Sequence, residues 1–234
     1  MSDTTSNSPS VAVFDFDKTL IDGDLAYLFL NAAIKSSKVR RMAAGMLIPV
    51  LLPFLLIRPG RVVAVSVLLW IATFPLRGKT ARAVFGAFAP GVLLPPIKVR
   101  FYDEGMKALA AHRRLGHRLL IISGSPQELV RQVAQPVLER DIQIIGSRIV
   151  PFLGGLVYRS YCMGPDKIKL ARELGVLDKN WDYGYSDSAW DIPLLTHCRH
   201  RFLVNPDKKT IKRTKAALGG RVTILNWTDT KNQS

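Results

Sequence analysis

The sequence is poor in cysteine, histidine and acidic residues. Its two cysteines, Cys162 and Cys198, are too few for a disulfide framework, and we expect both to be reduced thiols. The four histidines do not have the spacing of metal ligands, so we expect them to be surface or packing residues. The 18 acidic residues are outnumbered by 33 basic ones, which gives a formal net charge of +15. Such a charge favours an anionic partner, either nucleic acid or an anionic membrane.

A secretory signal is also missing. The first ten residues, MSDTTSNSPS, contain no basic segment followed by an apolar one, and we expect residues 1–10 to be a disordered polar leader. A motif that reads nucleic acid is missing as well, because aromatic residues are not interleaved with the basic runs. Nucleic acid is therefore not an expected partner, which leaves a membrane surface.

No apolar run is long enough to cross a bilayer without help. Two apolar blocks, residues 42–57 and 62–76, are separated by the basic turn RPGR. As helices of roughly 15 residues each, they would reach about 24 Å, short of the ~30 Å hydrocarbon core. Pro49 and Pro53 would also kink the first helix. Both blocks are apolar all round, unlike an ordinary surface helix.

Basic residues flank both blocks and occupy the turn between them, where they would lie at the depth of lipid headgroups. They are Arg40, Arg41, Arg58, Arg61, Arg77, Lys79 and Arg82. We therefore expect residues 42–76 to form a hairpin that dips into the membrane surface, while a full span remains possible. Burial inside a larger cap and use as a dimer interface are the alternatives.

The rest of the sequence alternates between strands and helices. Strands are predicted over residues 11–16, 118–122, 142–145, 181–185, 201–205 and 221–225. Helices are predicted over residues 25–36, 98–115, 165–174 and 207–218, and a β-hairpin over residues 148–161. Ser125 followed by Pro126 predicts the N-cap of one more helix. This alternation predicts an α/β fold with a doubly wound parallel sheet.

Polar residues follow the predicted strands at the edge of the sheet where ligands bind in such folds. They are Asp15, Asp17 and Thr19 after the first strand, Ser123 and Gly124 after the second, Lys167 before a helix, and Asp187 and Asp191 near the end. Carboxylates, a hydroxyl at a helix N-terminus and a lysine together suit phosphoryl transfer with Mg²⁺.

Each residue of this set has an expected role. Asp15 would attack phosphorus as a nucleophile, and Asp17 would serve as general acid and then general base. The side chains of Asp15 and Asp187, with the backbone carbonyl of Asp17, would hold Mg²⁺. The substrate phosphate would be bound by Ser123, Gly124, Lys167 and Thr19, with Asp191 in support.

The segments DFDKT, ISGS, GPDK and YSDSAWD resemble the four motifs of the haloacid dehalogenase-like superfamily, in particular its phosphoserine-phosphatase-like branch. The resemblance implies a Rossmann-like core over residues 11–22 and 98–228, with a helical, apolar cap inserted over residues 23–97. The last motif departs from the pattern of the branch, since Ser186, Ser188 and Trp190 stand where Gly, Gly and Asn are common.

Within that branch, the apolar hairpin and the motif GYSDS are similar to membrane-associated phosphatidylglycerophosphatases. This resemblance implies hydrolysis of a lipid phosphomonoester, phosphatidylglycerophosphate, at the cytoplasmic face of the cell inner membrane. The alternative is a soluble small-metabolite phosphatase of the phosphoserine phosphatase type. A membrane or nucleic-acid binder without activity is the third reading, and the oligomeric state is left open. Asp24 is a further candidate substrate contact.

Overall fold

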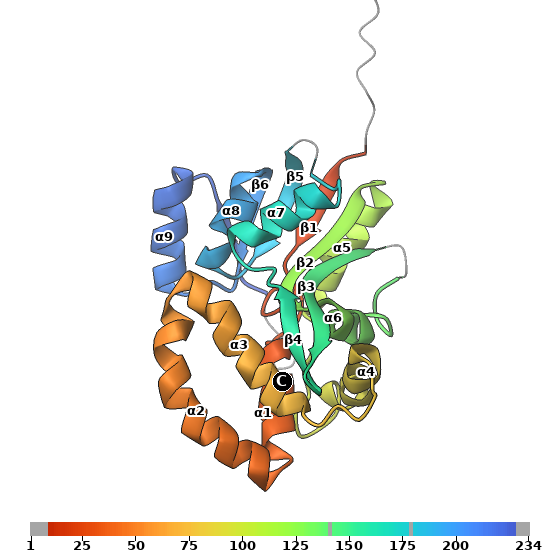
Figure 1. The fold of residues 1–234 in the computed structure, drawn as a ribbon. Coiled ribbons are helices and arrows are strands. Elements are labelled where there is room, and N and C mark those ends of the chain that lie inside the picture. Colours follow the sequence, from red (N-terminus) through yellow and green to blue (C-terminus); the bar gives the residue numbers. More distant parts are fainter. Residues whose placement is uncertain (1–8, 140–141, 178–179, 228–234) are drawn as a thin grey trace, which may run out of the picture.

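The computed structural model describes residues 9–139, 142–177 and 180–227. The predicted leader therefore lies outside the described residues except for its last two positions. The described strands form one sheet in the order β4-β3-β2-β1-β5-β6-β7, in which only β3 and β4 are antiparallel. The strands are β1 Val11–Phe14, β2 Arg118–Pro126, β3 Gln143–Phe152, β4 Gly155–Ser160, β5 Trp181–Ser186, β6 Cys198–Val204 and β7 Thr223–Leu225. The α/β fold with a Rossmann-like parallel sheet is thus confirmed (Figure 1).

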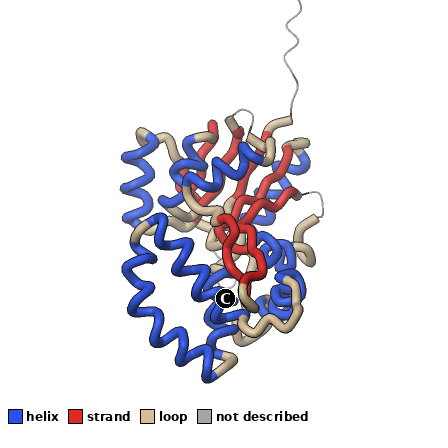
Figure 2. The backbone as a smooth tube through the Cα atoms, in the orientation of Figure 1, coloured by secondary structure: helices blue, strands red, loops and turns tan. Residues whose placement is uncertain are grey.

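Helices cover both faces of this sheet and its lower end. The α-helices are α1 Leu25–Lys35, α2 Lys38–Leu56, α3 Arg58–Thr73, α4 Ala81–Val92, α5 Asp103–Arg114, α6 Gln127–Ala134, α7 Pro165–Glu173, α8 Ile192–Thr196 and α9 Lys208–Leu218. Helices α1 to α3 lie beyond the carboxyl ends of the strands, where the insertion between β1 and β2 places them (Figures 1 and 2).

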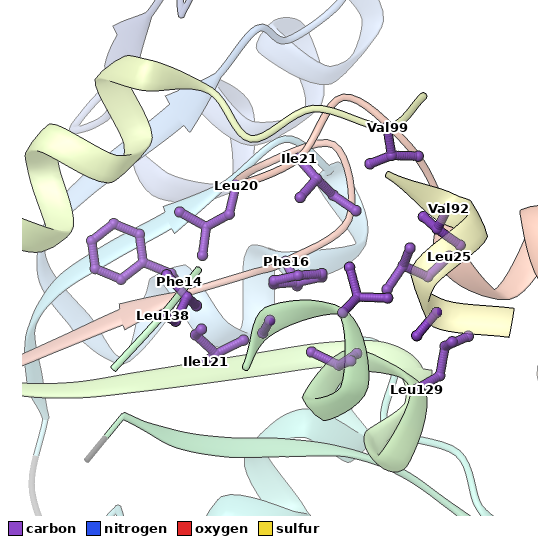
Figure 3. Close-up of a cluster of buried hydrophobic side chains, with 14 of the residues drawn as sticks. Phe14, Phe16, Leu20, Ile21, Leu25, Val92, Val99, Ile121, Leu129 and Leu138 are labelled. Carbon is purple, nitrogen blue, oxygen red and sulfur yellow. The ribbon is translucent and has the colours of Figure 1, made fainter. Parts of the chain in front are cut away.

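Alternation along β1 separates two apolar cores. Ala12 and Phe14 belong to a core shared with α5 and α6, whereas Val13 belongs to a second core shared with α7 and α8. The first core continues past the strand through Phe16 and Leu25 to α1 and α4 (Figure 3). Phe16 and Leu25 are completely buried, so apolar packing anchors both ends of the loop between β1 and α1.

Two local predictions are wrong, each because of a tertiary contact. The helix expected from residue 98 begins at Asp103, since the preceding backbone pairs with the loop after β1: Tyr102 N donates to Leu20 O at 2.9 Å. Ser125 does not cap a helix, because β2 continues to Pro126 and the Ser125 hydroxyl accepts from Ala26 N at 3.1 Å. The strand expected over residues 142–145 is present from Gln143, as the first part of the longer β3 that continues into the predicted hairpin.

The two apolar blocks fold as α2 and α3, which pack side by side, and α2 remains one curved helix through Pro49 and Pro53 (Figure 1). Helix α4 was not predicted. No helix in the described part of the chain combines the length and the apolar character needed to cross a membrane.

Candidate active site

Asp15 lies directly after β1, at the centre of the sheet. Its backbone N–H donates to Tyr185 O at 2.9 Å, which continues the pairing with β5. The side chain is buried, and its two oxygens have different partners. Oδ1 accepts from Lys167 Nζ at 2.6 Å, and Oδ2 accepts from the Thr19 hydroxyl at 3.3 Å. This geometry fixes the carboxylate at the carboxyl end of the strand.

Lys167 is buried between two carboxylates. Besides Asp15, its Nζ donates to Asp191 Oδ2 at 2.7 Å, and the same oxygen accepts from Ser186 Oγ at 2.8 Å. Burial alone would lower the pKa of Lys167, but Asp15 and Asp191 outweigh it and raise that pKa well above its usual range. The lysine therefore remains charged, and Asp191 holds it in place.

Asp17 faces the beginning of α1. Its Oδ1 accepts from Leu25 N at 2.8 Å, and its Oδ2 accepts from Ser123 Oγ at 2.7 Å. Burial raises the pKa of Asp17, and the charge of Asp24 raises it further, while hydrogen bonds from Leu25, Ser123 and Ser125 act in the opposite direction. The raised pKa favours a protonated carboxyl, the form that a general acid needs.

Thr19 contacts two other residues of the predicted site. Its fully buried hydroxyl donates to Asp15 Oδ2 and accepts from Asp187 N at 3.0 Å, so it joins the loops after β1 and β5. In this arrangement Thr19 orients the nucleophile, and its contact with a phosphate stays a prediction. The phosphate contact expected of Ser123 also stays a prediction. The Ser123 hydroxyl is buried, donates to Asp17 Oδ2 and accepts from Ser125 N at 3.0 Å.

A cleft of about 370 Å³ brings the predicted residues together. Six of them line it: Asp15, Asp17, Gly124, Lys167, Asp187 and Asp191. Residues that were not predicted as site residues also line the cleft, among them Tyr161 and Met163 after β4 and Trp190 of the last motif. Asp24 also lines the cleft, and it caps α1 by accepting from Tyr27 N at 2.9 Å.

The donor set suits a divalent cation held by two carboxylates and a carbonyl. Among the described residues, no group of three or more His, Cys, Asp or Glu side chains could hold a metal, and the expected ligand set of Asp15, Asp17 and Asp187 stays a prediction. Burial and the charge of Asp191 raise the pKa of Asp187 to about 6. Burial raises the pKa of Asp15 well above its usual value, against the charge of Lys167. A bound cation would relieve this crowding of carboxylates.

Comparisons with curated proteins give partial matches. Over 135 residues the chain is 33% identical to the "Inhibition of morphological differentiation protein" of Streptomyces azureus, which covers 54% of this chain and 46% of that protein. A probable phosphatase of Mycobacterium tuberculosis is 28% identical over 114 residues, 46% of this chain and 38% of that protein. The chain thus spans less than half the length of these relatives.

Solved structures match over nearly the whole chain. A Bordetella pertussis protein of unknown function superimposes with a TM-score of 0.67 at 18% identity, covering 93% of this chain and 99% of that one. A phosphoserine phosphatase holding an analogue of its phospho-aspartyl intermediate gives a TM-score of 0.56 at 14% identity, covering 93% and 94%. Identities this low establish a shared fold alone. The model of the haloacid dehalogenase-like hydrolases matches residues 12–196, and this chain therefore belongs to that family.

Proposed function

We propose that this chain is a Mg²⁺-dependent phosphomonoester hydrolase that forms an aspartyl-phosphate on Asp15. The observation that carries the proposal is the ion-pair arrangement of Lys167, whose Nζ lies 2.6 Å from Asp15 and 2.7 Å from Asp191 in the cleft that also contains Asp17. A buried cation beside a nucleophilic carboxylate can neutralise the equatorial oxygens of a phosphoryl group during transfer.

The reaction would take two displacements. In the first, an oxygen of Asp15 forms a bond to phosphorus, the ester P–O bond breaks, and Asp17 gives its proton to the leaving oxygen. In the second, water attacks the phosphorus, Asp17 takes the proton of that water, and Asp15 is released with inorganic phosphate. When bound, Mg²⁺ would supply positive charge between the nucleophile and the phosphoryl oxygens.

We propose a lipid phosphomonoester as the substrate, specifically phosphatidylglycerophosphate. The support for a lipid comes from α2. A set of large apolar side chains on this helix is between 39% and 71% exposed: Met42, Met46, Leu47, Ile48, Val50, Leu52 and Phe54. We call this set the α2 apolar surface. With the net charge of +15, it fits a helix lying in the interface of an anionic membrane. The proposed location is the cytoplasmic face of the inner membrane.

A soluble small-metabolite phosphatase is the second candidate, and the comparisons favour it. The matching phosphoserine phosphatase covers 93% of this chain, and a cytosolic 5′-nucleotidase bound to cytidine covers the same share with a TM-score of 0.56. On this reading the α2 apolar surface would have another occupant.

Phosphate release and membrane binding separate the two candidates. We would measure phosphate release with Mg²⁺ from phosphatidylglycerophosphate in mixed micelles, phosphoserine and nucleoside monophosphates. Co-sedimentation with vesicles of phosphatidylglycerol would be measured for the wild type, a Met46→Glu/Val50→Glu double variant and a Leu115→Glu control. Leu115 is 70% exposed at the end of α5, away from α2.

The lipid proposal expects the wild type and the control to sediment with the vesicles and the double variant to remain in solution. Release from soluble esters alone, with all three proteins in the supernatant, would favour the second candidate. Release from no ester would contradict phosphatase activity itself.

A further inference from the structure

The active-site cleft adjoins a second cavity, with which it shares lining residues. This cavity, of about 430 Å³, shares Tyr161, Met163 and Trp190 with the cleft and is also lined by Arg61 and Val62 at the beginning of α3. A molecule whose phosphate is bound at Asp15 therefore has space to extend toward α3.

Val62 also borders a third cavity, a groove of about 510 Å³ between α3 and the β3–β4 hairpin. Its walls are apolar side chains, among them Val63, Val67, Trp70, Phe152 and Val157. Figure 1 shows α3 running alongside β4. We call this cavity the α3 groove.

Two polar groups in the walls of the α3 groove, the Ser66 hydroxyl and the Trp70 indole N–H, are already paired. Ser66 Oγ accepts from Tyr158 N at 3.2 Å, and Trp70 Nε1 donates to Phe152 O at 3.0 Å. These bonds fix the hairpin against α3 and leave an apolar surface to face an occupant. An alkyl chain fits such a surface, since it needs no hydrogen bonds.

Arg61 lies where the polar cleft changes to the apolar groove. Its guanidinium stacks over the ring of Trp190 at 4.4 Å from the centroid, and its Nε donates to Leu55 O at 2.9 Å. Among the described residues it forms no ion pair. A positioned guanidinium with free donors suits an anionic group between the phosphomonoester and an apolar chain.

We propose that the α3 groove binds the acyl chain of the substrate, with Arg61 facing an anionic group at its entrance. The inference rests on the proposed phosphomonoesterase activity and specifies its substrate class as an amphiphile. The proposed occupant is the substrate's own chain, because each cavity shares lining residues with the next. The cleft and the second cavity share Tyr161, Met163 and Trp190, and the second cavity and the α3 groove share Val62.

The test is the dependence of kcat/KM on chain length. Short-chain phosphatidylglycerophosphates would be used below their micelle concentration, so that the α2 apolar surface and any bilayer have no part in the measurement. Deacylated glycerophosphoglycerophosphate is the reference. For the wild type, kcat/KM should rise with each methylene group by up to about fourfold at full burial.

Two variants should weaken that dependence. Val63→Glu places a charge in the groove at a side chain that is 57% exposed, so the fold should tolerate it. Val67→Phe narrows the groove without adding charge. Arg114→Gln and Leu115→Glu, at the exposed end of α5, are the matched controls and should keep the wild-type slope. A slope near zero in the wild type, or equal slopes in all five proteins, would overturn the proposal.

A binding measurement distinguishes failure of the groove from failure of the activity. Calorimetry with alkyl phosphonates of increasing length needs no turnover. Tighter binding with length in the wild type, lost in Val63→Glu, would support the groove even if no ester were hydrolysed, in which case the proposed activity alone would fail. Affinity independent of length would overturn the groove whatever the activity.

Discussion

At the scale of single residues, the site concentrates charge where water is scarce. Asp15, Lys167 and Asp191 are each no more than 5% exposed, yet they form a connected set in which the lysine serves both carboxylates. One cation cannot neutralise two neighbouring carboxylates in a buried place. Burial raises the pKa of Asp15, the charge of Lys167 lowers it, and repulsion from Asp191 and Asp187 raises it further. The site is therefore organised to receive further positive charge.

The assignment of the nucleophile can be tested by Asp15→Asn. The amide has nearly the same shape but cannot form the acyl phosphate, so phosphate release should fall by about 1,000-fold or more. Because the Asn oxygen can still accept from Lys167, the far-UV circular dichroism and the melting temperature should stay close to those of the wild type. Turnover within about tenfold of the wild type would contradict a nucleophilic Asp15.

Affinity for Mg²⁺ should depend on pH through Asp187, whose pKa is raised to about 6. A protonated carboxyl is a poor metal ligand, so protons and Mg²⁺ compete below that pH. The apparent Kd for Mg²⁺, measured from activation of phosphate release, should rise by about tenfold for each pH unit below about 6 and level off above it. A Kd that stays constant between about pH 5 and 7.5 would contradict a ligand at Asp187 with this raised pKa.

Sequence alone could name the chemical groups but not their contacts. Asp15, Asp17, Lys167 and Asp187 follow from residue type and from their places beside strands and helices. By contrast, the hydrogen bond from Leu25 N to Asp17 depends on the direction in which α1 leaves the loop. The position of Thr19 between two loops likewise depends on a pairing 168 residues apart.

At the scale of elements, the sequence predicts most accurately those helices and strands whose ends are marked by turn or cap residues in their own segment. The hairpin about Gly154 and Gly155 and the helix from Pro165 have turn and cap signals in their own sequence. The beginning of α5 and the end of β2 are set by partners elsewhere in the chain, which residue order does not reveal. The α3 groove could not be predicted for the same reason, since the hydrogen bond that joins its two walls connects Ser66 and Tyr158, 92 positions apart.

Packing of α3 on the hairpin should depend on Gly155. A Cβ at this position would lie 2.5 Å from Trp70 Cδ1, inside contact distance of a side chain that itself bonds the hairpin. Gly155→Ala should lower the free energy of unfolding by about 1–3 kcal/mol, measured by urea denaturation.

Gly45→Ala in α2 is the matched control, because nothing lies within 4 Å of its added methyl group. It should instead stabilise the protein by about 0.5–1 kcal/mol, as expected for replacing glycine inside a helix. Equal effects of the two substitutions would contradict the tight contact between Gly155 and Trp70.

At the scale of the whole molecule, the site joins segments from all parts of the chain. Asp15 comes from the centre of the sheet, Asp17 contacts the first inserted helix, and Asp187 lies near the other end of the sequence. A ligand that binds only this assembled site must stabilise the complete fold, because the unfolded chain does not bring these groups together.

Mg²⁺ should therefore raise the melting temperature, and Asp187 should govern the effect. At tenfold excess over Kd the stabilisation is about 1.4 kcal/mol, or roughly 3–6 °C for a chain of this size. The folded pKa of Asp187, about 6, lies above its unfolded value of 3.8, so the metal-free protein loses stability as pH rises from about 4 to about 6, where only the unfolded chain has released the proton. Mg²⁺ offsets this loss, and the shift should be larger at about pH 7.5 than at about pH 5.

Asp187→Asn removes both the ligand and the buried negative charge. Scanning calorimetry of this variant should show no Mg²⁺-dependent shift and, without metal at about pH 7.5, a melting temperature at or above that of the wild type. The backbone bond from residue 187 to Thr19 is kept in the variant, so the loops after β1 and β5 remain joined. A metal-free variant that melts well below the wild type would mean that the carboxylate of Asp187 stabilises the fold, which is incompatible with its raised pKa.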